Sequence, residues 1–180
     1  MDATTLIATL QPDVPEARLD PAPSIDLQTT IYAPSEHLVA IARVLRDRPD
    51  LRFTFLADIT AVDVHPAVPR FELVYMLVSI EHAQRLRLKL RLPGEDAHVA
   101  TVSGVWPAAN WLEREVWDLF GIQFDGHPDP RRLLMPEDWE GFPLRKDYPV
   151  QIRMKPHTGE ALQVTEKEFR DNIMKDRLGR

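Results

Sequence analysis

Basic and apolar residues alternate over the last eight positions of the stretch Gln84–Leu92. Positions 86, 88, 90 and 92 are leucine, and the positions between them are basic. Because successive side chains of a β-strand point to opposite faces, this pattern predicts a strand with one buried face. The basic row is then either a solvated face that protects a sheet edge or a docking surface for an acidic neighbour. It comprises Arg85, Arg87, Lys89 and Arg91.

Further strands and two helices are predicted around this strand. Residues rich in Phe, Val, Tyr and Leu mark strands, and apolar residues three and four apart mark helices. The strands are Asp26–Tyr32, Arg52–Ala57, Arg70–Ile80 and, as a short one, His98–Ser103. The helices are Pro34–Arg48 and Pro107–Phe120, the second ended by Gly121. Without a regular βαβ alternation, this order favours an α+β fold with a mixed or largely antiparallel sheet.

The two ends of the chain show little periodicity. Residues 1–25 hold four prolines and predict a flexible N-terminal segment, followed by the α+β domain over 26–127. Residues 128–180 hold six prolines and no convincing strand, which predicts an extended irregular segment that binds a neighbour. It should end in a short helix, because Thr165 and Glu168 form a capping box ahead of Phe169, Ile173 and Met174.

Composition narrows the function classes. A length of 180 residues, with 44% hydrophobic and 28% charged, suits one globular domain with extensions or two small domains. The net charge of −6 argues against nucleic acid or an anionic membrane surface as the main partner. The absence of cysteine excludes disulfides and a conventional iron–sulfur cluster within this chain. The longest apolar run, Leu73–Ile80, is too short to span a membrane, so we expect a soluble cytoplasmic protein or one attached through other subunits.

No familiar catalytic motif occurs. Gly-rich nucleotide loops and a serine elbow are missing, and the six histidines form no closely spaced pair, so no metal site is predicted. Glu113, Glu115 and Asp118 are the candidates for acid–base chemistry. At about 100° per residue, however, Glu113 and Glu115 diverge on opposite flanks of the helix. Arg114 and Asp118, four residues apart, can pair with each other.

The outer face of the helix Pro107–Phe120 carries aromatic residues. The predicted apolar stripe of this helix is formed by Leu112, Val116, Leu119 and Phe120. Trp111 projects beside Arg114 and Asp118, opposite this stripe, and Trp117 lies to one side. Aromatic and Arg residues on such a face are a common interface composition. The alternative is that the proline-rich segment folds back and covers them, and both can hold.

The stretch Glu113–Pro149 resembles the signature of a known family. It contains EREVWDLFGI, GHPDPRRLLMPEDWEG and PLRKDYP, and covers about a fifth of the chain. These runs resemble the C subunit, or thirty-kilodalton subunit, family of bacterial NADH–quinone oxidoreductase, respiratory complex I. Two positions depart from the family pattern: Pro130 stands where an aliphatic residue is usual, and Phe142 where His is common.

The resemblance implies a non-catalytic accessory subunit of the peripheral arm of a proton-translocating enzyme. Such a subunit binds no cofactor itself, whereas the complex uses FMN, iron–sulfur clusters, NADH and quinone. Its implied partners are chiefly the D subunit, then the B and I subunits, on the cytoplasmic side of the bacterial cell membrane. Three alternatives remain: the equivalent small subunit of a membrane-bound hydrogenase or formate hydrogenlyase, a free-standing adaptor, and a stand-alone hydrolase using Glu113, Glu115 or His127.

The charged residues of the signature predict a structural role. Arg bridges carboxylates bidentately, so it can fix irregular backbone where regular ladders are absent. We therefore expect Arg131 or Arg132 to pair with Glu115 or Asp118. No catalytic, cofactor-binding or metal-binding residue is predicted. The predicted structural or interface residues are Trp111, Glu113, Arg114, Glu115, Asp118, His127, Arg131, Arg132, Arg145, Lys146, Asp147 and Tyr148.

Overall fold

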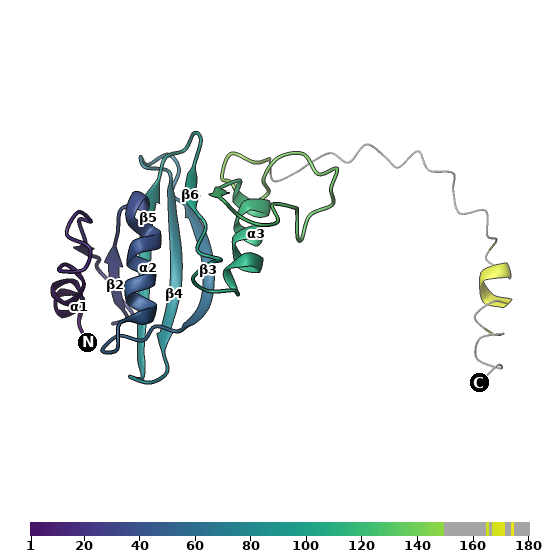
Figure 1. The fold of residues 1–180 in the computed structure, drawn as a ribbon. Helices are drawn as coiled ribbons and strands as arrows, with labels where there is room; N and C mark the ends of the chain where they lie inside the picture. Colours follow the sequence, from purple (N-terminus) through teal and green to yellow (C-terminus); the bar gives the residue numbers. More distant parts are fainter. Residues whose placement is uncertain (150–164, 166, 172–173, 175–180) are drawn as a thin grey trace. The chain divides into compact units, whose positions relative to one another are not determined.

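A computed structural model describes residues 1–149, 165, 167–171 and 174 of the chain. The chain divides into two compact units, residues 1–148 and 149–180. In the first unit, a five-stranded sheet has the order β1-β2-β5-β4-β3, with β2 and β5 parallel and the other pairs antiparallel (Figure 1). The predicted α+β class with a mixed sheet is confirmed. The strands are β1 (Asp20–Pro21), β2 (Thr29–Tyr32), β3 (Phe55–Asp63), β4 (Phe71–Ser79) and β5 (Gln84–Leu92).

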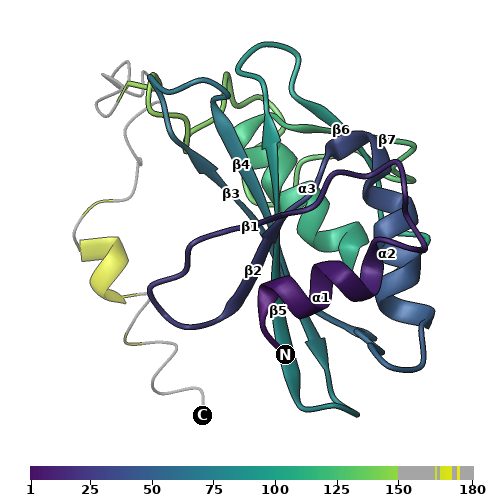
Figure 2. The same cartoon turned by 90° about the vertical axis from the view of Figure 1, so that its left-hand side faces the viewer.

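Three α-helices lie on one side of this sheet (Figure 2). They are α1 (Ala3–Leu10), α2 (Leu38–Asp47, preceded by the 3-10 turn η1, Ser35–His37) and α3 (Ala109–Phe120). The leucines of β5 are buried on this side in the same core as Ile41 and Leu45 of α2. Each such burial contributes about 1.5–3 kcal/mol. The amphipathic patterns therefore direct the strand and the helix toward each other.

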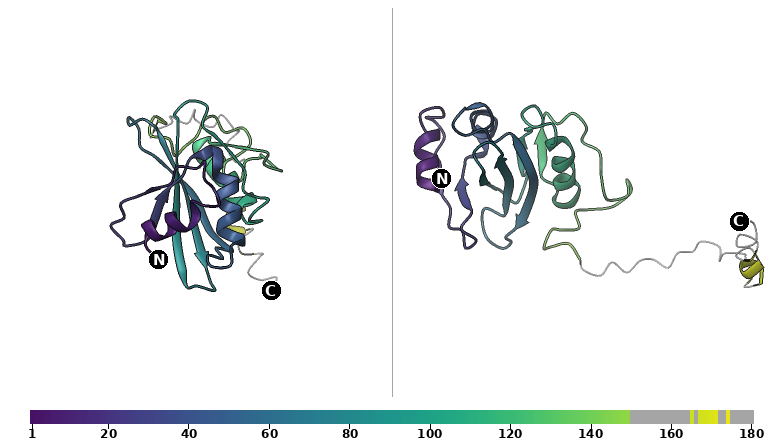
Figure 3. Two further views of the ribbon diagram at one scale, coloured as in Figure 1. Left: turned by 60° about the vertical axis from the view of Figure 1, so that its left-hand side comes forward. Right: turned by 90° about the horizontal axis from the view of Figure 1, so that it is seen from below.

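Helices α1 and α3 lie at opposite ends of the row of strands (Figure 3). Helix α1 contacts β1 and β2, whereas α3 contacts the edge strand β3. Val116 and Phe120 of α3 are buried as predicted, and Leu112 and Leu119 pack partly against the core.

The N-terminal region differs from the prediction. Residues 1–25 include helix α1, whose Leu6 and Leu10 are buried in the main core. Asp2 caps the helix by accepting a hydrogen bond of 2.7 Å from the backbone N–H of Thr5. A helix of only eight residues offers too few turns for a clear periodic signal, which explains why the prediction missed it.

The predicted strand Arg52–Ala57 is displaced. Strand β3 runs over Phe55–Asp63, with a register shift between Leu56 and Asp58. Its outward positions are exposed and mixed in character, so its hydrophobic signal is weak. A second, two-stranded parallel sheet, β6 (His98–Ala100) with β7 (Gln123–Asp125), includes one strand that was not predicted. Strand β7 follows α3 closely and brings residues 123–125 of the signature beside β6 and the loop after it.

The segment 128–148 is irregular, as predicted, but it belongs to the same compact unit as the sheet. In the second unit, residues 167–171 are helical. The predicted capping box is confirmed: the N–H of Thr165 donates to Glu168 Oε2 at 2.9 Å, and the N–H of Glu168 donates to Thr165 Oγ1 at 3.3 Å. Ile173, predicted for its apolar stripe, lies outside the described residues.

Within the part of the chain that the structure describes, no helix has the length and apolar character that a membrane span requires. Over the same residues, no group of three or more His, Asp and Glu side chains is arranged to hold a metal ion.

Candidate functional site

The chain turns back at the C-terminal end of α3. Residues 128–148, the returning segment, are attached to this helix. Gly121 adopts the left-handed conformation (φ +74°) and its N–H donates to the Trp117 carbonyl at 2.8 Å, so it ends the helix as predicted. Farther along, Arg145 Nε donates to the Phe120 carbonyl at 2.5 Å, and the N–H of Leu144 donates to the Leu119 carbonyl at 3.1 Å. A cation at the negative end of a helix is stabilising. Arg145 therefore ties the returning chain to α3.

Asp118 is the main anchor of the segment. Its side chain is fully buried and its Oδ1 accepts a hydrogen bond of 2.6 Å from Arg132. Its Oδ2 accepts three backbone N–H groups, those of residues 133, 134 and 135, at 3.0, 2.7 and 2.9 Å. Burial alone would raise the pKa of Asp118, but these donors together lower it below the ordinary value. The predicted contact between Arg132 and Asp118 is confirmed.

Arg114 holds the same segment from a neighbouring turn of the helix. It donates to the carbonyls of Arg131 and Arg132, both at 2.9 Å, and pairs with Asp129 at 3.3 Å. The predicted pairing of Arg114 with Asp118 is wrong, because the returning chain supplies better-placed acceptors to Arg114 and donors to Asp118. Arg131 itself is exposed and pairs with Asp129 at 2.6 Å.

A second anchor joins the segment to the hairpin between β3 and β4. Arg70 donates two hydrogen bonds to buried Asp63, at 3.1 and 2.7 Å, and two to Asp147, at 3.0 and 2.7 Å. The backbone N–H of Lys146 adds a hydrogen bond to Asp63 at 2.9 Å. Arg70 lowers the pKa of the Asp63 carboxyl well below its usual range. Asp63 and Arg70 were not predicted as site residues.

Glu113 occupies a buried polar niche on the core side of α3. Its carboxylate has no exposed surface, and it accepts hydrogen bonds from the Thr101 hydroxyl and, at 2.8 Å, from the Val102 N–H. Burial raises its pKa to about 7, against the opposing effect of these two donors. Glu115, by contrast, is only half-buried. The two carboxylates thus occupy different environments, as the helical geometry predicts.

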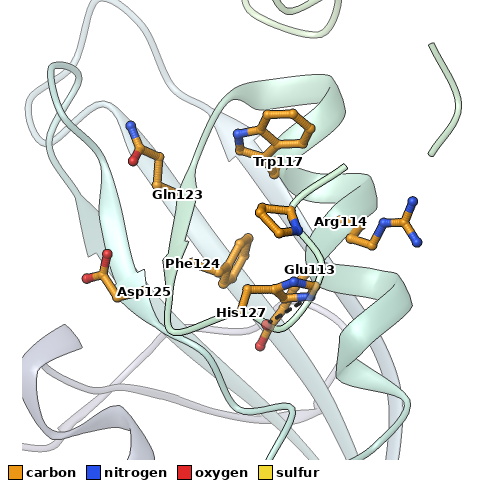
Figure 4. Close-up of a pocket in the computed structure, with 8 residues that line it drawn as sticks. Glu113, Arg114, Trp117, Gln123, Phe124, Asp125 and His127 are labelled. Carbon is orange, nitrogen blue, oxygen red and sulfur yellow. Dashed lines mark ion pairs between the residues drawn. The ribbon is translucent and has the colours of Figure 1, made fainter. Parts of the chain in front are cut away.

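His127 lies beside Glu113 but is held by other groups. Its Nε2 is 3.0 Å from the Asn110 carbonyl, and its Nδ1 accepts the N–H of Asp129 at 3.0 Å. These partners assign the neutral ring with its proton on Nε2. The Glu113 carboxylate is 3.8 Å from that nitrogen (Figure 4). Both ring nitrogens are therefore occupied in fixing the turn 127–129.

A small pocket opens next to this pair (Figure 4). Its volume is about 130 Å³, whereas small-molecule sites measure roughly 300–1,000 Å³. It has room for ordered water rather than for a cofactor. The lining residues are Glu113, Arg114, Trp117, Gln123, Phe124, Asp125, His127 and Pro130.

The aromatic residues of the signature divide into covered and exposed groups. Trp117 is half-buried beneath Arg132, whose guanidinium is 5.6 Å from its ring, whereas Trp111 remains 59% exposed with Arg114 at 5.1 Å. Tyr148 donates to the Glu140 carbonyl at 3.1 Å and stacks with Trp139 at 6.4 Å. The segment thus folds back onto α3, yet leaves Trp111 accessible to a neighbour.

The raised pKa of Glu113 predicts an unusual pH dependence. A carboxyl with a folded-state pKa of about 7 and an ordinary value of 4.5 binds more protons when folded, so stability falls as pH rises through this interval. The loss should be on the order of 3 kcal/mol. Glu113→Gln should abolish that slope in urea unfolding measured at about pH 5, 6 and 7, with Glu115→Gln as the control. An unchanged slope in Glu113→Gln would contradict the assignment.

Comparison with known proteins identifies a family and individual relatives to which this chain is similar. The family described as respiratory-chain NADH dehydrogenase, 30 Kd subunit, matches residues 31–153. The second C-type subunit (C 2) of the NADH-quinone oxidoreductase of Rhizobium meliloti (strain 1021) is 48% identical over 148 residues, covering 79% of this chain and 81% of the relative. The C-type subunit of the NADH-quinone oxidoreductase of Roseiflexus sp. (strain RS-1) is 44% identical over 150 residues, covering 83% and 86%.

Two solved structures share the fold. The trypsin-resistant fragment (1–134) of Nqo5 is 32% identical, with a TM-score of 0.52 over 69% of this chain and 98% of the fragment. A chain of the membrane-bound sulfane sulfur reductase, an archaeal respiratory membrane complex, is 26% identical, with a TM-score of 0.67 over 82% of this chain and 85% of that one.

Proposed function

The chain belongs to the 30-kDa subunit family of respiratory-chain NADH dehydrogenases, and on that premise we propose that it is a non-catalytic subunit of the peripheral arm of proton-translocating NADH–quinone oxidoreductase. In this role it supports electron transfer from NADH to quinone by holding other subunits in place. The similarity to Nqo5 over most of the fragment's length supports this assignment.

One observation carries the scaffold role. Asp118 and Arg114 of α3 are hydrogen-bonded to residues 131 and 132 of the returning chain, so these charged signature residues are used in structural contacts. Catalytic acids and bases need access to a substrate in a productive pose. These side chains instead fix an irregular segment in one shape. A fixed surface without regular secondary structure suits recognition by neighbouring subunits.

Exposed apolar side chains on α3 and the segment are candidates for the contact. Trp111, Leu134 and Leu144 are 59%, 59% and 51% exposed. Large exposed apolar and aromatic residues are typical anchors of protein interfaces. We assign this surface to the D subunit, with the B and I subunits as further neighbours, at the cytoplasmic side of the bacterial cell membrane.

This chain is proposed to bind none of the complex's cofactors. It has no cysteine to ligate iron–sulfur clusters, and its pocket beside Glu113 is too small for FMN or a quinone ring with its substituents. FMN, the clusters, NADH and quinone would be bound by partner subunits.

The alternatives have less support. A hydrogenase or formate hydrogenlyase subunit is not favoured, because the relatives at 44–48% identity are named as NADH-quinone oxidoreductase subunits. A stand-alone hydrolase would need an accessible acid–base pair, whereas Glu113 is fully buried and both nitrogens of His127 have backbone partners.

The test is purification of the tagged chain from membranes, with NADH–quinone activity measured on the same material. We expect the other complex I subunits and this activity to co-purify with the chain. Recovery of hydrogenase subunits, or of the chain alone, would contradict the proposal.

Deleting residues 150–180 tests whether the C-terminal region serves assembly. Residues 1–148 form a compact unit with its own core, so the shortened chain should unfold at nearly the same temperature as the full chain. Recovery of the complex on the tag should fall, because the deleted residues would contact a neighbouring subunit. A shortened chain that fails to fold would count against this role, and so would one that assembles normally.

A further inference from the structure

Within residues 1–148, no helix lies on the other side of the sheet, which is crossed by the loop that precedes β2 (Figure 2). The basic row of β5 lies on this side, opposite outward-facing residues of β4: Arg85 faces Val78, Arg87 faces Met76, Lys89 faces Val74 and Arg91 faces Glu72. Beyond β4, strand β3 adds Phe55, Asp58, Thr60 and Val62. We call this surface the open face.

The middle of the open face is apolar. Half-buried Met76 and Val78 form a strip along β4 together with Val74, which is itself buried. On β3, Phe55 and Val62 are 51% and 45% exposed. With its other side already in the core, β4 is therefore apolar on both faces. Strands of this kind are typically covered on both sides, whereas a strand with one solvated face alternates apolar and polar residues. Within residues 1–148, helices cover only one side of β4.

The basic row along this strip is only partly neutralised. Lys89 pairs with Glu72 at 2.9 Å and Arg87 with Asp26 at 2.6 Å. Arg85 and Arg91, at the two ends of the row, are exposed and have no carboxylate of the described residues within 4 Å. The guanidinium of Arg91 is 3.9 Å from the centre of the Tyr32 ring, which orients it without neutralising it. Two of the four cations of the row thus have no carboxylate partner among the described residues, although the chain has a net charge of −6.

We propose that the open face binds an acidic amphipathic helix of another subunit of the complex, with its carboxylates over the basic row and its apolar side on the β4 strip. Successive cations of the row are about 6.6–6.8 Å apart. Carboxylates four residues apart on a helix are separated by about 6 Å, so several pairs can align. Covering the apolar strip supplies binding energy, while the charges fix the register. The inference rests on the proposed function and specifies the chemistry of one partner.

Cross-linking in the assembled complex tests the occupant directly. A photoreactive p-benzoylphenylalanine in place of Met76 should link to a peptide of another subunit that carries carboxylates three or four residues apart beside apolar residues. The same group in place of exposed Arg43 on α2 is the control and should not link to that peptide. Links to a second copy, to residues 165–180 of this chain or to a peptide without acidic residues would overturn the proposal, as would no link.

Charge reversal provides the quantitative test. Arg85→Glu with Arg91→Glu should lower recovery of the complex on the tagged chain by about tenfold, and more at low salt, because attraction becomes repulsion. Arg43→Glu should leave the recovery of the complex unchanged. The combined Arg85→Lys and Arg91→Lys substitutions should leave it unchanged as well. Thermal unfolding of the double variant should stay close to that of the original chain. If the original chain recovers its partners and the reversed one does so equally, the docking site is wrong; if the original recovers none, the proposed function fails.

Discussion

Replacing Asp118 with alanine should release the part of the segment 128–148 around residues 132–135 while the sheet stays folded. The substitution removes the acceptor of Arg132 and of three backbone N–H groups at one buried point. Removing one member of a buried charge pair costs about 3–5 kcal/mol, because the remaining partner is left buried and unpaired. The cost here falls on the segment, which can open and hydrate, since the main hydrophobic core contains none of its residues.

Amide hydrogen exchange measures this release. Exchange of the N–H groups of Leu133, Leu134 and Met135 should accelerate by about two to three orders of magnitude, the equivalent of 3–4 kcal/mol. Protection in β4 and β5 should change little. Glu115→Ala, on the same helix, is the matched control and should leave all of these rates nearly unchanged. Equal protection of residues 133–135 in Asp118→Ala and the original chain would refute the anchoring role.

The same anchor should respond to acid. The pKa of Asp118 is lowered in the folded chain, so its contribution is present above the unfolded value of about 3.8 and is lost as pH falls through the folded value. The segment should therefore loosen in strong acid. Glu113, five residues earlier, has a raised pKa and loses its contribution as pH rises toward 7. One helix thus carries two carboxyls with opposite pH dependence.

Gly121→Ala, at the C-terminal cap of α3, should destabilise the chain markedly. A Cβ at this position would overlap the Phe142 ring and lie 2.6 Å from the Arg145 guanidinium, and the backbone is left-handed. The conformation costs a non-glycine residue about 1–2 kcal/mol, and overpacking adds about 1–3 kcal/mol. We expect the free energy of unfolding to fall by about 2–5 kcal/mol in urea titrations, accompanied by displacement of Arg145 from the helix end.

Gly104→Ala is the natural control, because among the described residues no atom beyond its two chain neighbours lies within 4 Å of the added methyl group, and its φ lies outside the left-handed region. A second experiment separates the two causes. In a Phe142→Ala background the cost of Gly121→Ala should fall toward that of the backbone conformation, since the ring has gone. Equal costs for Gly121→Ala and Gly104→Ala would show that the close approach at Gly121 is unimportant.

Much of the fold followed from local patterns. The alternation in β5 predicted its bounds correctly, and the stripe of α3 with Gly121 predicted its end. The contact of Arg132 with Asp118 was expected because both lie in one dense, mixed-charge stretch. Such predictions succeed where a short sequence window determines the geometry.

The other contacts depend on residues that are distant in sequence. Arg70 and Asp147 are 77 positions apart, and no periodicity relates them. Arg114 was paired with Asp118 by helical spacing, but that spacing describes an isolated helix surface. Because residues 128–148 pack on α3, their backbone carbonyls accept hydrogen bonds from Arg114, and their backbone N–H groups donate to Asp118. Helix α1 was missed for a simpler reason, since eight residues carry too little pattern.

The arrangement around α3 also determines what tryptophan fluorescence will report. Of the four tryptophans, Trp111 and Trp117 lie on α3 and Trp139 in the returning segment, whereas Trp106 donates to the Phe53 carbonyl in the core. Arg114 and Arg132 lie over the rings of Trp111 and Trp117. Tryptophan emission therefore reports mainly on α3 and residues 128–148. Circular dichroism reports mainly on the sheet and the helices. When the segment releases before the core melts, the two signals will separate, so the native chain carries its own optical reporter of that step.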